Sequence, residues 1–134
     1  MKYMLLMQFS AGMQDTLPPI TTWSADEIKA HMAFMNETNQ QLTASGELVD
    51  GQGLAMPETA KIVRGHGSGA PVVTEGPFPE TKEFLAGYWI VDCPTPERAV
   101  EIAAAVSAAP GPGGAPLNMP IEVRQVMSAP PTDL

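Results

Sequence analysis

Residues 74–91, TEGPFPETKEFLAGYWIV, decide the fold because a polar loop runs directly into a strand that is apolar on both faces. The first ten of these residues combine a Gly-Pro turn, a phenylalanine, three carboxylates and a lysine, which is the densest polar chemistry in the chain. The strand that follows, residues 84–93, places Tyr88 and Trp89 on opposite faces. We therefore expect a central strand that is covered on both sides, with the loop as the candidate site.

Five further segments have strand patterns. Residues 2–9 are apolar on nearly both faces, which predicts a second covered strand. Residues 47–54 are more polar and contain two glycines, which suits a strand at the edge of a sheet. Residues 61–64 and 72–74 predict a hairpin across a glycine-rich turn, and residues 121–127 predict a closing strand.

Two helices separate these strands. Ser24 and Glu27 have the spacing of a capping box at the start of the first helix, and Gly46 is placed to end it. For the second helix, Thr95 is the expected cap residue, and Pro96 follows it at the first helical position. The expected inward stripes are Ile28, Met32, Met35, Asn39 and Leu42 in the first helix and Ala99, Ile102, Ala103 and Val106 in the second.

In order, the elements are strand, helix, strand, inserted hairpin, strand, helix and strand. This order predicts an α+β protein with a ferredoxin-like βαββαβ antiparallel sheet, in which the first and third core strands are central. Two helices cover only one face of such a sheet, so the apolar residues of the other face need a second cover. A second copy of the same sheet is the simplest cover, and it gives a homodimer with a cavity between the two sheets.

The expected core combines residues from both faces of the central strands with the helix stripes. Its members are Leu5, Leu6, Met32, Leu42, Ile90, Val91, Ile102 and Val106. Asn39 is the polar member of a buried stripe and is expected to be a core amide with hydrogen-bond partners. His31 lies at the flank of that stripe with no histidine or cysteine at metal-ligand spacing beside it, so we expect a structural histidine and predict no metal or cofactor.

Length, charge and cysteine content limit the class of protein. A chain of 134 residues suits one domain, which we expect to span residues 1–134 with residues 128–134 as a loose tail. A formal net charge of −8 would repel a phosphate backbone, so direct nucleic-acid binding is not expected. The apolar run after Lys2 is too short for a signal peptide or a membrane span, and the single Cys93 is compatible with a reducing compartment. We expect a cytoplasmic protein without a membrane partner.

Three segments together resemble a known family. KYMLLMQF, TEGPFPETKEFLAGYWIVDCPTPERAVEIA and PIEVRQVM look like the YCII-related, DGPF-type family of small bacterial α+β proteins, in the same order and over almost the whole chain. The family signature resembles T-D-G-P-F-x-E-x-K-E, and it is matched by Thr74, Gly76, Pro77, Phe78, Glu80, Lys82 and Glu83. Glu75 departs from it, because the family usually has aspartate there.

The resemblance implies a ferredoxin-like fold and a dimeric α+β barrel related to cofactor-independent monooxygenases and lactone isomerases. Some relatives carry a histidine early in the first helix as a proposed acid/base. Counted from Gly46, the matching position in this chain is near Met35, so His31 does not inherit that role.

Glu75 and Glu80 are the candidate catalytic residues. They flank the Gly-Pro turn, and in an apolar cavity they would share a proton, since a like charge and desolvation both raise a carboxyl pKa. Alternatively, Lys82 or Arg124 pairs with them and keeps both ionised, or the loop is purely structural. The candidate ligand-binding residues are Phe78, Lys82, Tyr88, Trp89 and Arg124, of which only one of Tyr88 and Trp89 should face the cavity.

Two classes of function fit these residues. The first is a metal-free and cofactor-free enzyme that binds a small organic, anionic molecule in the inter-sheet cavity and acts on it by acid/base chemistry. The second is a non-catalytic ligand-binding or regulatory module, which the resemblance supports because related genes often accompany alternative sigma factors. The residues do not choose between the two.

Overall fold

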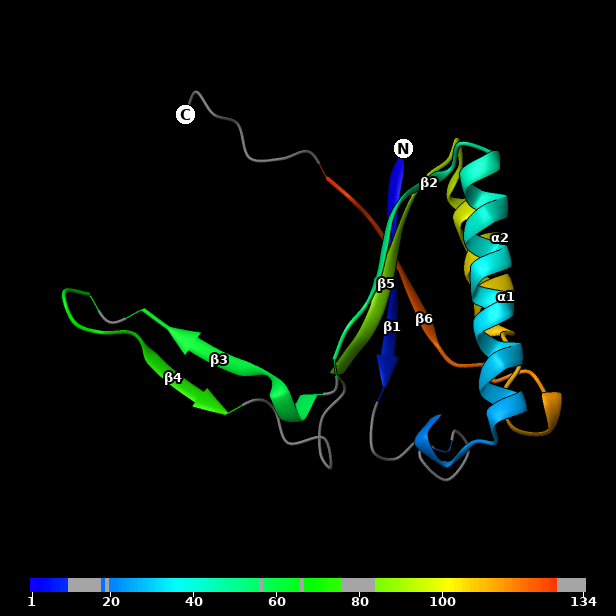
Figure 1. Ribbon diagram of the computed structural model, residues 1–134. Helices are drawn as coiled ribbons and strands as arrows, with labels where there is room; N and C mark the ends of the chain where they lie inside the picture. The colour runs from blue at the N-terminus through cyan, green and yellow to red at the C-terminus, as the bar shows by residue number, and fades with distance from the viewer. Residues whose placement is uncertain (10–17, 19, 56, 66, 76–83, 128–134) are drawn as a thin grey trace.

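The computed structural model describes residues 1–9, 18, 20–55, 57–65, 67–75 and 84–127. It contains a four-stranded sheet, two helices on one face of this sheet, and a two-stranded hairpin that projects on the other side (Figure 1). The strands of the main sheet are β1 (Lys2–Phe9), β2 (Leu48–Gly53), β5 (Phe84–Asp92) and β6 (Ile121–Gln125). The helices are α1 (Ala25–Ala44) and α2 (Pro96–Ser107), and the hairpin consists of β3 (Lys61–Arg64) and β4 (Val72–Glu75).

The main sheet has the strand order β2-β5-β1-β6, and every neighbouring pair is antiparallel. The two strands that were predicted to be apolar on both faces, β1 and β5, are therefore the central strands. The hairpin is inserted between β2 and β5, where the sequence predicts it. The ferredoxin-like α+β fold is thus confirmed.

Both helices begin at the predicted caps. Ser24 Oγ accepts a hydrogen bond from the Glu27 amide at 3.1 Å, and the Glu27 carboxylate accepts one from the Ser24 amide at 2.8 Å. Thr95 Oγ1 likewise accepts from the Arg98 amide at 3.2 Å. Gly46 follows the end of α1 with a φ of 78°, a left-handed conformation that glycine adopts without steric cost.

The core lies between the helices and one face of the sheet. Its buried residues are Tyr3, Leu5, Leu42, Trp89, Val91, Cys93, Ala99, Ile102, Ala103 and Val106. They include all four residues predicted for the inward stripe of α2. The indole of Trp89 lies against Gly51 of β2, where a Cβ atom would come within 2.9 Å of the ring, so glycine at this position makes room for the tryptophan.

Two residues of the predicted core are not buried. Met32 is 50% exposed. The inward line of α1 runs through His31, Met35 and Leu42 instead, because a period of 3.6 residues alternates steps of three and four. Ile90 is only partly buried, since it lies on the face of the sheet that has no helices.

Polar contacts tie the connections to the helices. His31 Nδ1 lies 3.0 Å from the carbonyl oxygen of Pro110, and its ring meets Trp23 edge-on at 5.4 Å between centroids, so this side chain links the connections before α1 and after α2. Arg98 donates to both carboxylate oxygens of Glu47 at 2.8 Å and thereby lowers the pKa of Glu47 to about 2.

Within the described ranges, no helix is long and apolar enough to cross a membrane.

The docking of α1 can be tested at Leu42, which is 5% exposed. Leu42→Ala should lower the free energy of unfolding by about 2–5 kcal/mol, because it removes apolar surface that is buried on folding and leaves a cavity in the core. Met32→Ala in the same helix is the matched control and should change this free energy by less than about 0.5 kcal/mol. Urea denaturation followed by circular dichroism measures both, and equal losses would show that α1 is docked differently.

Candidate functional site

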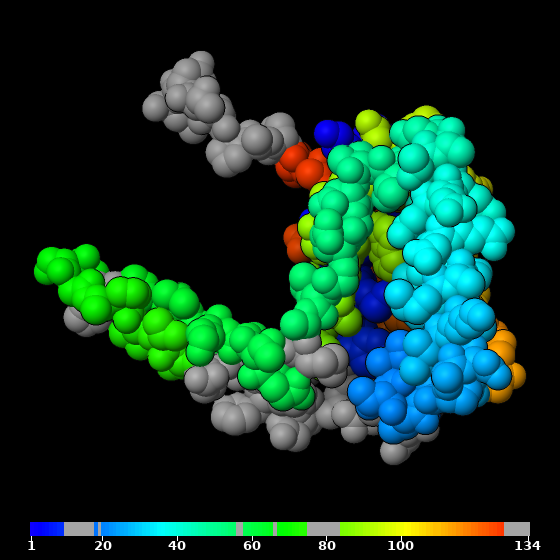
Figure 2. Space-filling view, in the orientation of Figure 1, coloured from blue at the N-terminus to red at the C-terminus, as the bar shows by residue number. Residues whose placement is uncertain are grey.

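Strand alternation places two sets of side chains on opposite faces of the central strands. Met4 lies directly between Ile90 and Arg124 in the sheet, and Leu6 lies between Tyr88 and Glu122. These residues share the face opposite the helices, because their neighbours along each strand belong to the buried core. Figures 1 and 2 show that neither α1 nor α2 lies on this face, which we call the open face.

The centre of the open face is apolar. Leu6 is only 8% exposed, and Met4 and Ile90 are partly buried by their neighbours in the sheet. These three side chains come from the two central strands and form a continuous floor. A flat apolar surface of this kind is typical of an interface or a binding site.

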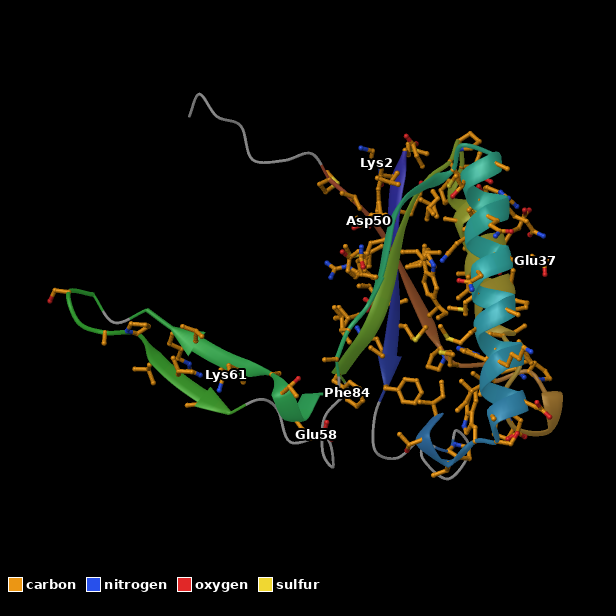
Figure 3. All side chains as sticks on the ribbon, in the orientation of Figure 1. Lys2, Glu37, Asp50, Glu58, Lys61 and Phe84 are labelled. Carbon is orange, nitrogen blue, oxygen red and sulfur yellow. The ribbon has the colours of Figure 1, made fainter. Side chains whose placement is uncertain are left out.

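Tyr88 and Asp50 form a hydrogen-bonded pair at one side of this floor. The Tyr88 hydroxyl donates to Asp50 Oδ2 at 3.0 Å, and Asp50 Oδ1 accepts from the Gly51 amide at 2.8 Å and from Gln52 Nε2 at 3.2 Å. These three hydrogen bonds lower the pKa of Asp50, and the bond from Tyr88 has the largest effect. The bond between Tyr88 and Asp50 also raises the pKa of Tyr88. Near neutral pH the site therefore offers an ionised carboxylate that is held by a neutral phenol. Figure 3 shows Asp50 on the side of the sheet away from α1.

Two cations lie on the open face, Arg124 on β6 and Lys2, which alternates with Met4 and Leu6 on β1. Arg124 lies opposite Met4 and is exposed, and its side chain forms no hydrogen bond or ion pair with any residue of the described ranges. Asp50, Ile90, Met4 and Arg124 form one row across the four strands. With a strand spacing of about 4.8 Å, the backbones of Asp50 and Arg124 are about 14 Å apart, with the apolar floor between them.

The structure settles which aromatic residue faces which way. Trp89 is 6% exposed and lies under the helices, where its Nε1 donates to Asn39 Oδ1 at 3.1 Å. Asn39 is thus the hydrogen-bonded core amide that its position predicts. Tyr88 is the aromatic residue on the open face.

The remaining predicted site residues belong to the 74–83 loop. Phe78, Glu80 and Lys82 lie outside the described residues. Glu75 ends β4, where its backbone pairs with Lys61. None of the four is therefore placed relative to the open face.

Asp50 was missed by sequence reasoning. The segment around it predicted only a polar edge strand, although Asp50 and Gln52 alternate with apolar or small residues in the way that one exposed face requires. A register shift between Leu48 and Asp50 sets the side chain against Tyr88, and such a shift has no clear mark in the sequence.

A depression lies between the two helices, away from the open face. It has a volume of about 330 Å³, with Phe34 and Ile102 among its apolar lining and Glu37, Arg98 and Glu101 among its charges. Arg98 already donates to Glu47 at 2.8 Å and to Glu101 at 3.1 Å. Its cation is therefore satisfied within the chain, and we place the candidate site on the open face.

The described ranges contain no group of three or more histidine, cysteine, aspartate or glutamate residues placed to hold a metal ion. The open face offers an anionic end at Asp50, a phenol at Tyr88 and a cationic end at Arg124. This arrangement can orient an elongated organic molecule by its two ends over an apolar floor.

Two comparisons identify relatives of this chain. The sequence model of the YCII-related domain matches residues 1–113. An uncharacterized protein of Rhizobium meliloti (strain 1021) is 32% identical over 89 residues, which cover 66% of this chain and 71% of that protein.

The Tyr88–Asp50 pair predicts a pH effect that is independent of any ligand. Tyr88→Phe removes the main hydrogen bond that lowers the pKa of Asp50, so this pKa should rise toward that of an ordinary aspartate. Carbon NMR of the aspartate carboxyl groups during an acid titration measures it. Tyr3→Phe is the control, because the Tyr3 hydroxyl donates to Met1 and not to Asp50. An unchanged Asp50 titration in Tyr88→Phe would mean that the pair does not form in solution.

Proposed function

This chain belongs to the YCII-related domain family, and from that premise we propose that it binds a small organic anion between the open faces of two copies of the chain. The observation that carries the proposal is the open face itself. It combines an apolar floor with Arg124, which has no partner among the described residues, and with the Tyr88–Asp50 pair. A face with these features gains stability when it is covered and gains specificity when its charges are matched.

A second copy is the cover that the fold favours. The faces of two sheets pack about 10 Å apart, and a two-fold axis brings identical apolar floors together. Arg124, Asp50 and Glu122 lie around the floor, so complete closure of a dry interface would bury their charges. An enclosed cavity between the sheets avoids that cost and leaves room for a ligand.

The charges define the class of ligand. An anionic group such as a carboxylate or enolate would take two or more hydrogen bonds from the Arg124 guanidinium. The apolar body of the ligand would lie on Met4, Leu6 and Ile90, and a hydroxyl or carbonyl group would meet Tyr88. We also include Phe78 and Lys82 in this site, because the loop that carries them leads into the central strand β5.

We extend the proposal to acid/base chemistry without a cofactor. Glu75 and Glu80 are the proposed acid and base, since the loop between β4 and β5 is the other source of carboxylates beside a central strand. Asp50 is ionised by its hydrogen bonds, so it can accept a proton or hold a positive charge but cannot act as the acid at neutral pH.

The same proposal covers the extent and location of the protein. We treat residues 1–134 as a single domain, and β6 supports this, since it pairs with β1 although it lies beyond residue 113, where the family match ends. A cytoplasmic location is supported by the single cysteine, Cys93, which is buried and is not needed for a crosslink.

Ligand binding is tested with a library of small aromatic and aliphatic carboxylic acids, by thermal shift and then by calorimetry. Arg124→Met should lower the affinity for the acids that bind by about 10- to 100-fold, because a charge-assisted hydrogen bond is lost. Lys29→Met on α1 removes the same charge from the helix side and should leave affinity unchanged. Equal affinity in the parent and both variants would place the site elsewhere.

Turnover separates the two classes of function in the same experiment. Mass spectrometry of a bound acid should show product with the parent protein and none with Glu75→Gln, while Glu83→Gln serves as the control in the same loop. Binding without any product would support a non-catalytic, regulatory module instead. A Glu75→Gln protein that fails to fold would assign that carboxylate to the structure of the loop.

Assembly is tested at Ile90, in the middle of the open face. The parent should sediment as a dimer at low micromolar concentration, and Ile90→Lys should be monomeric, because it would bury an unpaired charge at the interface. Val100→Lys is the control, since Val100 is 57% exposed on α2 and faces away from the sheet. A dimer that tolerates Ile90→Lys would not use the open face.

A further inference from the structure

The β3–β4 hairpin extends from the body of the protein as an arm (Figures 1 and 2). It leaves the sheet after β2 and the chain returns at the start of β5, and Figure 3 shows Lys61 on the arm and Phe84 at the end of the sheet beside it. A two-stranded hairpin without further packing is only marginally stable in water. The arm therefore needs a surface to pack on.

The arm is apolar on both of its faces. The register of β3 and β4 places Ile62 and Val72 on one face and Val63 and Val73 on the other. Their exposures are 43%, 45%, 59% and 52%, respectively. A hairpin that merely lay on its own sheet would need only one apolar face, so both faces of this arm indicate packing between surfaces.

The charge of the arm is opposite to that of the rest of the chain. The arm, from β3 to the end of β4, contains Lys61, Arg64 and one acidic residue, Glu75 at its base, so its formal charge is +1, whereas the other 14 acidic and 5 basic residues give the rest of the chain −9. The Arg64 side chain forms no hydrogen bond or ion pair within the described ranges. An electropositive arm is complementary to the strongly acidic body of another copy of the same protein.

The reach of the arm suits such a contact. At about 3.3 Å per residue, the four-residue strands β3 and β4 are each about 13 Å long. A four-stranded sheet with a strand spacing of about 4.8 Å is of similar width. Figure 2 shows the arm extending on the side of the open face, where the proposed second copy would sit.

We propose that the β3–β4 arm is an inter-subunit clasp, which packs on a second copy of this chain and closes one end of the cavity between the two sheets. The inference rests on the proposed dimer and adds the element that holds it together. Each copy would supply one arm, so the two-fold axis gives two equivalent clasps and leaves neither arm exposed. The single cavity between the two sheets would then be incomplete without the arms of both copies.

The first test removes the apolar surface of the arm and keeps its shape. The fourfold variant Ile62→Thr, Val63→Thr, Val72→Thr and Val73→Thr retains β-branched side chains and strand propensity. Sedimentation equilibrium should show a dimer Kd at least about tenfold weaker than that of the parent. Val100→Thr on α2 is the control and should leave the Kd unchanged. An unchanged Kd in the fourfold variant would contradict the clasp.

The second test identifies what the arm touches. Val63 is replaced by a photo-reactive benzophenone amino acid, and equal amounts of light- and heavy-nitrogen protein are mixed before illumination. Crosslinked peptides that join light to heavy chains are expected. Crosslinks only within one chain, or none, would overturn the proposal, because the arm would then pack on its own body or on another partner.

The outcomes separate the clasp from the proposed site. If Ile90→Lys dissociates the dimer while the arm variant and the crosslinks show no effect, the clasp is wrong and the cavity between the open faces stands. If the arm variant dissociates the dimer and Ile90→Lys does not, the clasp stands and the face-to-face cavity is wrong.

Discussion

The pairing of β1 with β5 is the constraint on which the rest of the structure depends. Both strands are central and apolar on both faces, and the described part of the chain has only two α-helices with which to cover them. Both helices lie on one face, where Leu5 and Val91 are completely buried. The opposite face keeps Met4, Leu6 and Ile90 without a helix above them. The fold therefore leaves on this face an apolar surface that neither α1 nor α2 covers.

The fold could be predicted from the sequence because its signals are local. The helix starts are marked by capping residues that contact a residue only three positions further along the chain. The central strands are marked by apolar runs that can be recognised without knowledge of their partner strands. The phase of α1 was less secure, because Met32 and His31 are adjacent positions on the border of the inward stripe. An apolar side chain favoured Met32, whereas the geometry of the helix buries part of His31 and exposes half of Met32. Alternation of hydrophobic residues identifies the inward side of a helix but not its exact centre.

The site was harder to predict because it depends on contacts between distant segments. Alternation separates Tyr88 from Trp89 but does not say which of them faces the helices. That choice is made by Gly51, which leaves room for the indole, and by Asn39, which accepts its N–H. Asp50 meets Tyr88 across 38 positions of sequence and only through an irregular strand register. Arg124 was the accessible case, since its face follows from its position between Val123 and Gln125 in a regular strand.

The charges around the open face also limit what a dimer formed through this face would enclose. Two apolar floors related by a two-fold axis bring two Arg124 guanidinium groups into the same interface, together with the carboxylates of Asp50 and Glu122. Asp50 already accepts three hydrogen bonds, from Tyr88, Gly51 and Gln52, so much of its capacity is used within its own sheet. Arg124 has five donors and no partner among the described residues, which makes it the group with most to gain from a ligand. In the proposed dimer, a ligand would therefore compete with carboxylates of the protein for this guanidinium, which an anion does most effectively.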